Sequence, residues 1–175
     1  MANVHAVVRT DRMEGTGDRN SLVSIKYIVS TTPTAIENGN VLKRGALIEG
    51  EREVFEGSTP ARDDALDDIV LVASPEVMYD ERKHNLDDFT NEAGKIARAY
   101  HLRKGDIFGV TAEALAFATS EADDGKVGSV VELKAGTKLQ VVKAATGATS
   151  GSTVVGKIIA IDVVGRYTYY VILVG

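Results

Sequence analysis

The chain has 175 residues, of which 44% are hydrophobic and 26% are charged, so it is long enough for one well-buried globular domain and too apolar for wholesale disorder. Its net charge of −5, without any cluster of five Lys or Arg residues, argues against nucleic acid and anionic lipid as partners. The absence of cysteine excludes disulfide bonds, thiolate metal sites and a cysteine nucleophile.

The first residues lack a basic leader followed by an apolar core. No run approaches the roughly 18 to 20 apolar residues that a membrane span requires. We therefore expect a protein made in the cytoplasm, with no export signal and no membrane partner.

The N-terminal 20 residues predict an extended arm followed by a loop. Residues 4–9 read as a short strand or arm, and residues 14–20 are polar and punctuated by glycine. Residues 22–30 alternate, with Val23, Ile25, Tyr27 and Val29 forming the more apolar face of a strand.

The next part of the chain predicts a meander of short strands. Asn38 and Gly39 favour a turn that leads into residues 41–56. An acidic connector then precedes residues 69–73, a continuous apolar run that is typical of a central strand. Residues 74–102 lose this periodicity, and long irregular segments are usually either functional or mobile.

Helical signals are few and short. Residues 88–93 could form one helical turn before Gly94. Thr111 is placed as the N-cap of a helix over residues 112–119, with Glu113 in its first turn. Residues 120–126 read as a polar loop.

The end of the chain, residues 126–175, predicts a pair of β-hairpins. The runs 130–142 and 153–174 carry apolar residues on both faces, so they need a second cover, either from their own domain or from a partner. The predicted fold class is mainly β, a barrel-like or sandwich-like body of short strands and hairpins with one or two short helices, in one domain over residues 1–175.

The sequence lacks the motifs of common catalytic and metal sites. Its three histidines form no metal-ligand spacing. The doublets Asp63/Asp64, Asp67/Asp68, Asp87/Asp88 and Asp123/Asp124 favour solvated loops, with a weak calcium site as the main alternative. A glycine-rich run at residues 15–20 lacks the third glycine of a dinucleotide fingerprint. We expect no enzymatic activity, no catalytic residue, no metal and no cofactor.

Aromatic and charged residues are interleaved in the irregular segment, at Met78, Tyr79, Arg82, Phe89 and Tyr100. Tyr and Arg often anchor protein interfaces, so this set predicts a binding surface. The alternative, of equal weight, is a loop that folds back and buries these rings within the chain.

The same two alternatives apply to the tyrosines of the last strand, where Tyr167 and Tyr169 share one face and Tyr170 lies opposite. The complete set of candidate interface residues comes from the arm, the irregular segment and the last strand: Val4, His5, Arg9, Met78, Tyr79, Arg82, Lys83, Phe89, Tyr100, Tyr167, Tyr169 and Tyr170.

Several short phrases, spread over most of the chain, carry a family resemblance: residues 3–10 (NVHAVVRT), 73–83 (ASPEVMYDERK), 89–94 (FTNEAG), 105–108 (GDIF) and 165–170 (GRYTYY). They resemble small structural proteins encoded among the head genes of tailed bacteriophages, the capsid decoration or cement proteins. The resemblance implies a non-enzymatic virion protein that binds the outer face of an expanded icosahedral capsid and links neighbouring major capsid subunits.

The partners so implied are the major capsid protein and, as an option left open, further copies of the chain in a small homo-oligomer. Two alternatives remain at this stage. One is another virion component, from the tail or the head–tail connector. The other is a small OB-like binding domain, or an enzyme that uses dispersed acidic residues.

Overall fold

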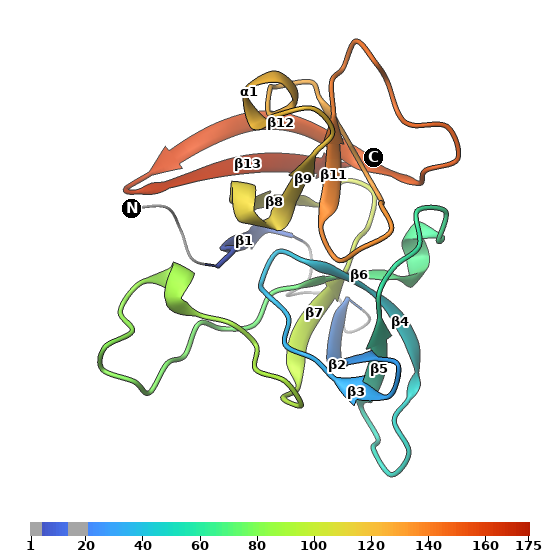
Figure 1. Ribbon diagram of the computed structural model, residues 1–175, viewed down its shortest axis with the longest axis vertical. Coiled ribbons are helices and arrows are strands. Elements are labelled where there is room, and N and C mark those ends of the chain that lie inside the picture. Colours follow the sequence, from blue (N-terminus) through green and yellow to red (C-terminus); the bar gives the residue numbers. More distant parts are fainter. Residues whose placement is uncertain (1–4, 14–20) are drawn as a thin grey trace.

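A computed structural model of the protein describes residues 5–13 and 21–175 and places them in two β-sheets (Figure 1). Strands hold 43% of the residues and helical segments 8%, with one short α-helix and a few 3₁₀ turns. The mainly β fold class predicted from the sequence is confirmed.

The first sheet has six strands in the order β3-β2-β5-β4-β6-β7, and an additional pairing of β2 with β7 closes five of them into a barrel. The β2–β5 pair is parallel and the other pairs are antiparallel. The strands are β2 (Leu22–Val29), β3 (Thr32–Pro33), β4 (Val41–Leu47), β5 (Val54–Ser58), β6 (Ile69–Val72) and β7 (Ala97–His101).

The second sheet has seven strands in the order β1-β8-β13-β12-β10-β11-β9 and curves into a half-barrel. The hairpins expected near the end of the chain are present as the antiparallel pairs β10–β11 and β12–β13. The strands are β1 (Val8–Arg12), β8 (Ile107–Val110), β9 (Leu115–Phe117), β10 (Val130–Glu132), β11 (Leu139–Val142), β12 (Val154–Val164) and β13 (Tyr167–Val174).

Strand β6 is buried on both faces and joins the two sheets. Ile69 and Leu71 belong to a core shared with the seven-stranded sheet, whereas Val70 and Val72 belong to the core inside the barrel. All four side chains are fully buried. The sequence prediction of a central strand at this position is confirmed, and the second sheet is the second cover that its two apolar faces require.

The alternation predicted for residues 22–30 is confirmed for three of its four apolar positions. Val23, Ile25 and Tyr27 of β2 are buried in the barrel core, and Leu22 on the other face is exposed. The prediction is wrong for Val29, the last residue of the strand, which is exposed. The outer face of β2 is therefore available to whatever packs beside the barrel.

The prediction of a helix over residues 112–119 is wrong. A 3₁₀ helix, η4 (Ala112–Ala114), is followed directly by strand β9, which pairs in parallel with β11. The Thr111 hydroxyl accepts a hydrogen bond from the Val7 N–H at 3.2 Å and caps no helix. Pairing with β11 and burial of Leu115 outweigh the local helical signal.

Two further local predictions, the polar loop at residues 120–126 and the helical turn at residues 88–93, differ from the structure. The α-helix α1 (Glu121–Asp124) lies where a polar loop was expected, and the Ser120 side chain caps it. The turn expected at residues 88–93 is instead the 3₁₀ helix η3 (Leu86–Asp88). A further 3₁₀ helix, η2 (Leu66–Asp68), ends the acidic connector.

The described part of the N-terminal segment is packed into the fold. Ala6 and Val7 are buried, and β1 pairs with β8 through Val8 and Val110. Of the two alternatives for residues 4–9, a short strand or an extended arm, the strand is therefore found, shifted to Val8–Arg12, and residues 5–13 are not a free arm. Residues 1–4 and 14–20, including the candidate interface residue Val4, lie outside the described residues.

The two-sided burial of β6 predicts that truncating it destabilises the whole protein. Replacing Leu71 by Ala should lower the free energy of unfolding by about 2 to 5 kcal/mol, because a cavity forms in the shared core. Urea unfolding measures the change. As a control, Leu47→Ala removes the same atoms from an exposed position of β4 and should have an effect of about 0.5 kcal/mol or less. Equal effects of the two substitutions would contradict this account.

Candidate functional site

The connection between β6 and β7, residues 73–96, leaves the barrel and projects beside it (Figure 1). Between this loop and the outer wall of the barrel lies an open groove of about 730 Å³. Its floor includes Leu22 and Ser24 from β2 and Arg98 from β7, and its other side is lined by the loop. We call this feature the groove.

The groove is rich in exposed apolar side chains. Tyr79 on the loop is 96% exposed, and Val77 and Ile96 are also mostly exposed. Met78 and Phe89 are half-buried in its lining. Large apolar side chains that line a concave, water-exposed surface are typical of a site that a partner covers.

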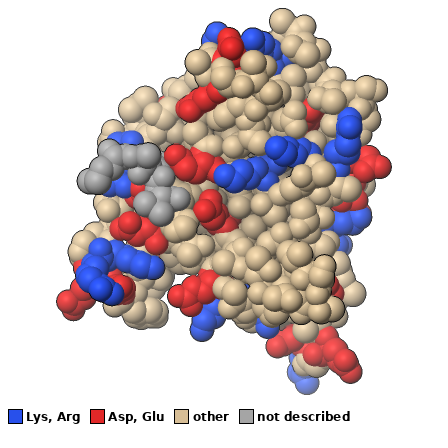
Figure 2. Space-filling view, viewed as in Figure 1, with Lys and Arg blue, Asp and Glu red and all other residues tan. Residues whose placement is uncertain are grey.

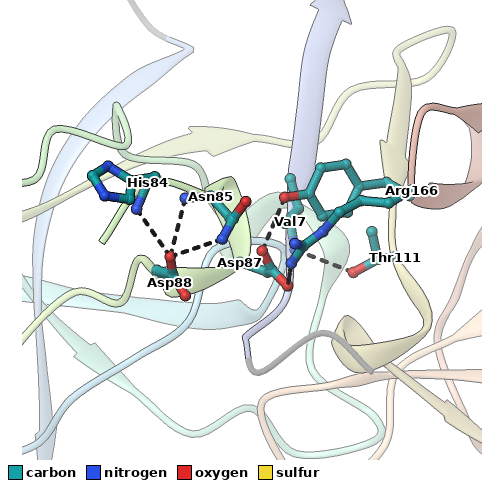
Figure 3. Close-up of polar contacts among 8 residues, drawn as sticks. Val7, His84, Asn85, Asp87, Asp88, Thr111 and Arg166 are labelled. Carbon is teal, nitrogen blue, oxygen red and sulfur yellow. Dashed lines mark hydrogen bonds and ion pairs between the residues drawn. The ribbon is translucent and has the colours of Figure 1, made fainter. Parts of the chain in front are cut away.

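Acidic and basic side chains are mixed on the same loop, and Figure 2 shows charged residues of both signs interspersed with uncharged surface on this side of the molecule. Asp80 accepts hydrogen bonds from Nε and Nη2 of Arg82, each at 3.0 Å. These bonds lower the pKa of Asp80 from its ordinary value. Asp88 accepts from the backbone N–H groups of Asn85 at 3.0 Å and His84 at 3.1 Å, and the Asn85 N–H chiefly lowers its pKa (Figure 3).

Asp87 fixes the middle of the loop to two other parts of the chain, through its buried carboxylate (Figure 3) and through its backbone carbonyl. Asp87 is 1% exposed, forms an ion pair with Arg166, and accepts a hydrogen bond from the Tyr167 hydroxyl at 2.9 Å. Its backbone carbonyl accepts from the His5 N–H at 3.1 Å. We call the contact of Asp87 with Arg166 and Tyr167 the Asp87 anchor.

Burial alone raises the pKa of Asp87, but the hydrogen bonds from Arg166 and Tyr167 outweigh it, so the pKa lies below its ordinary value. The same environment raises the pKa of Tyr167, first through burial and then through Asp87. The prediction that the acidic doublets lie in solvated loops is wrong for Asp87. It is also wrong for Asp124, which is buried and accepts from the Ser120 N–H at 3.2 Å.

Both ends of the loop are fixed as well. The Asn38 amide donates to the Ser74 carbonyl at 2.8 Å and accepts from the Ser74 N–H at 3.0 Å. The Asn91 amide donates to Asn38 and to the Ile36 carbonyl, each at 3.1 Å. The loop is therefore held near residues 74, 87 and 91, and the exposed part around Tyr79 lies between these fixed points.

Of the residues predicted for the interface, the structure brings Met78, Tyr79, Lys83 and Phe89 together in the groove. Arg82 lies on the same loop and pairs with Asp80. The sequence left open whether this loop buries its rings or presents them. Phe89 is half-buried, whereas Tyr79 is presented to solvent.

The other predicted residues lie elsewhere. His5 Nδ1 is 2.9 Å from Oε1 of Glu37. The Arg9 guanidinium lies over the Tyr169 ring at 5.1 Å and forms a 4.0 Å ion pair with Asp162. Tyr100 packs against the core that the two sheets share.

The tyrosines of β13 divide as their alternation predicts. The Tyr167 and Tyr169 rings are 6.2 Å apart on one face, and Tyr170 lies on the other, edge-on to Phe117 at 5.7 Å. Tyr169 and Tyr170 are 3% and 4% exposed, so the core alternative holds for both and their assignment to an exposed interface is corrected. Burial, followed by the hydrogen bond to Glu121, raises the pKa of Tyr170.

The floor of the groove was missed by the sequence reasoning. The alternation of β2 places Leu22 and Ser24 on the outer face, and Ser24 is opposite Arg98 in the β2–β7 pairing. The pattern does not indicate which loop lies over that face, because this depends on the distant contacts of Asn38 and Asp87.

Within residues 5–13 and 21–175, no group of three or more His, Asp or Glu side chains is arranged to hold a metal ion. No helix in the same part of the chain is long and apolar enough to cross a membrane.

The Asp87 anchor predicts a specific loss of stability. Asp87→Ala should lower the free energy of unfolding by about 1 to 3 kcal/mol, because it leaves the Tyr167 hydroxyl and Arg166 without their buried acceptor. Chemical denaturation measures it. Asp80→Ala removes an equivalent carboxylate from an exposed pair and should change stability little. If Asp87→Ala left the free energy of unfolding unchanged, the anchor would not stabilise the fold.

The direction of the Asp87 pKa shift predicts how this loss depends on pH. Since the pKa is lower in the folded chain, the stabilisation is complete above the unfolded value of about 3.9 and disappears as the pH falls through the folded value. The difference in unfolding free energy between wild type and Asp87→Ala should therefore shrink below about pH 4. Urea titrations between about pH 6 and pH 3 test this, and a difference independent of pH would count against it.

Comparison with known proteins leaves the site to be interpreted from its own geometry. No family model matches the chain, and neither a curated protein nor a solved structure matches it.

Proposed function

We propose that the chain is a structural virion protein that binds the outer surface of an icosahedral phage capsid and stabilises it by linking neighbouring major capsid subunits. The observation that carries the proposal is the groove, whose exposed apolar lining includes the almost fully exposed Tyr79. The sequence resemblance to capsid decoration proteins supplies the class of partner.

The fixed loop supports a binding role. Binding costs less conformational entropy when the contacting segment is already held in place. The bonds of Asn38, Asn91 and Asp87 hold the loop on both sides of Tyr79. Aromatic residues, Met and Arg are enriched at protein interfaces, and Met78, Tyr79 and Arg82 are presented here together.

A protein that links two subunits needs a second contact surface, and the β12–β13 hairpin offers one. At its tip, Ile161, Val163 and Val164 are all exposed, Val163 by 73%. The hairpin joins the loop through the Arg166–Asp87 ion pair. Two exposed apolar surfaces are thus held in a fixed relation to each other.

Stabilisation of a capsid by such a protein follows from mass action, because a ligand that binds the assembled shell shifts the equilibrium toward it. Each stable interface would bury on the order of 1,200 to 2,000 Å². When contacts repeat around a shell, even modest single interfaces add up to strong overall retention.

The direct experiment mixes the purified protein with undecorated expanded capsids and with undecorated procapsids. Co-sedimentation with expanded capsids and a raised temperature of capsid disruption are the expected results. Binding to neither particle would remove the proposal.

A tail or connector component is the first rival, and it would assemble into rings or tubes without any capsid. Size-exclusion chromatography with light scattering distinguishes the two, since a decoration protein remains a monomer or small oligomer. The second rival is an OB-like binding domain, which is favoured by the closure of five strands into a barrel. Salt-sensitive retention on single-stranded nucleic acid would support that rival.

The groove predicts which side chains matter for capsid binding. Tyr79→Ala combined with Arg82→Ala should weaken capsid association by about tenfold or more, equivalent to about 1.4 kcal/mol, and leave the thermal unfolding midpoint nearly unchanged. Quantitative co-sedimentation and thermal unfolding are the two measurements.

The matched control combines Leu47→Ala with Arg52→Ala, two exposed residues that do not line the groove, and it should bind capsids normally. A large drop in the unfolding midpoint of the Tyr79/Arg82 variant would assign these side chains to the core instead.

A further inference from the structure

The charged groups in the groove are unevenly paired. Asp80 is neutralised by Arg82, and Asp88 is satisfied by the N–H groups of residues 84 and 85. The three cations in the lining are Lys83, Lys95 and Arg98. Among the described residues, none of these cations forms an ion pair.

Asp88 and Glu92, the two other carboxylates in the lining, are likewise without an ion-pair partner in the described part of the chain. Three cations outside ion pairs therefore face two carboxylates outside ion pairs, which leaves the groove one surplus positive charge in a protein whose net charge is −5. The cations responsible are Arg98 on β7, Lys95 just before β7 and Lys83 on the loop.

The unpaired cations lie next to apolar side chains. Arg98 lies on β7 opposite Ser24, and Lys95 directly precedes the exposed Ile96. Lys83 lies on the loop, which also contributes Val77 and Met78 to the lining. An occupant that matches this surface has apolar side chains with carboxylates beside them.

We infer that the groove binds a short protein segment in which apolar side chains are flanked by Asp or Glu, with Lys95 and Arg98 pairing with its carboxylates. This inference rests on the proposed function and names the chemistry of the partner at the same site. A volume of about 730 Å³ is within the range of roughly 300 to 1,000 Å³ that accommodates a drug-sized ligand, so several side chains of a peptide fit. Arg can pair with a carboxylate through two parallel hydrogen bonds, which orients the segment as well as attracting it.

A nucleic acid fits this surface less well, although it too would meet cations and aromatic rings. Asp80, Asp88 and Glu92 line the same groove, and a continuous phosphate backbone would pass close to them. Separate carboxylates on a peptide can be placed beside the cations without that repulsion.

The test uses a random dodecapeptide display library as the probe and the full chain as bait. Peptides enriched on the wild type should carry apolar residues flanked by Asp or Glu. Their affinity should fall at least about tenfold for the double variant Lys95→Glu with Arg98→Glu. The control, Lys134→Glu with Arg52→Glu, makes the same change of charge at exposed positions outside the groove and should bind like the wild type. Thermal unfolding confirms that both variants are folded.

The inference is overturned if the library yields basic or uncharged peptides, or if it yields none that distinguish the wild type from the groove variant. It is also overturned if a single-stranded oligonucleotide binds with the same dependence on Lys95 and Arg98. Capsid co-sedimentation of the wild type is scored separately, so a failure of this inference can be distinguished from a failure of the proposed function.

Discussion

The rest of the structure depends on the burial of one short strand on both of its faces. Strand β6 has only four residues, yet Ile69 and Leu71 fill one core while Val70 and Val72 fill the other. Neighbouring β4 repeats this division with Val41 and Leu42. A β-strand presents alternate side chains to opposite faces, so a continuous apolar run is stable only when both faces are covered. The outer face of β4 and β6 thus packs against the seven-stranded sheet, and the apolar faces of both sheets are fully covered only when they pack together.

The same wall explains where the groove can form. On the β4–β6 side, the outer face of the barrel is covered by the seven-stranded sheet. On the β2–β7 side, the outer face around Leu22, Ser24 and Arg98 borders the loop that follows β6. That loop is held at a distance by polar contacts with other segments, chiefly those of Asn38 and Asp87. Because polar anchors fix the loop, its exposed apolar side chains, such as Val77 and Tyr79, are not needed for internal packing.

Much of the fold could be predicted from local patterns, and the site could be predicted only in part. Alternation in β2, the apolar run of β6 and the terminal hairpins are local signals that tertiary packing reinforces. The helix expected after Thr111 failed because a parallel pairing with β11, more than 20 residues away, decides the state of residues 115–117. Tyr79 stood out because of its residue type, but Leu22 and Arg98 did not, since they join it through contacts that no short window contains.

The roles of the acidic residues of the loop also could not be assigned from the sequence alone, because Asp87 pairs with a residue far along the chain. Asp87 and Asp88 are neighbours in a doublet that resembles a solvated loop, yet one is buried against Arg166 and the other accepts backbone hydrogen bonds. Internal donors satisfy both, and Asp80 as well, and in the described part of the chain none of these carboxylates forms an ion pair with Lys83, Lys95 or Arg98. A chain with an overall negative charge can thereby keep three cations outside ion pairs in an apolar groove. Its overall charge disfavours polyanions at long range, while the local cations select carboxylates at contact distance.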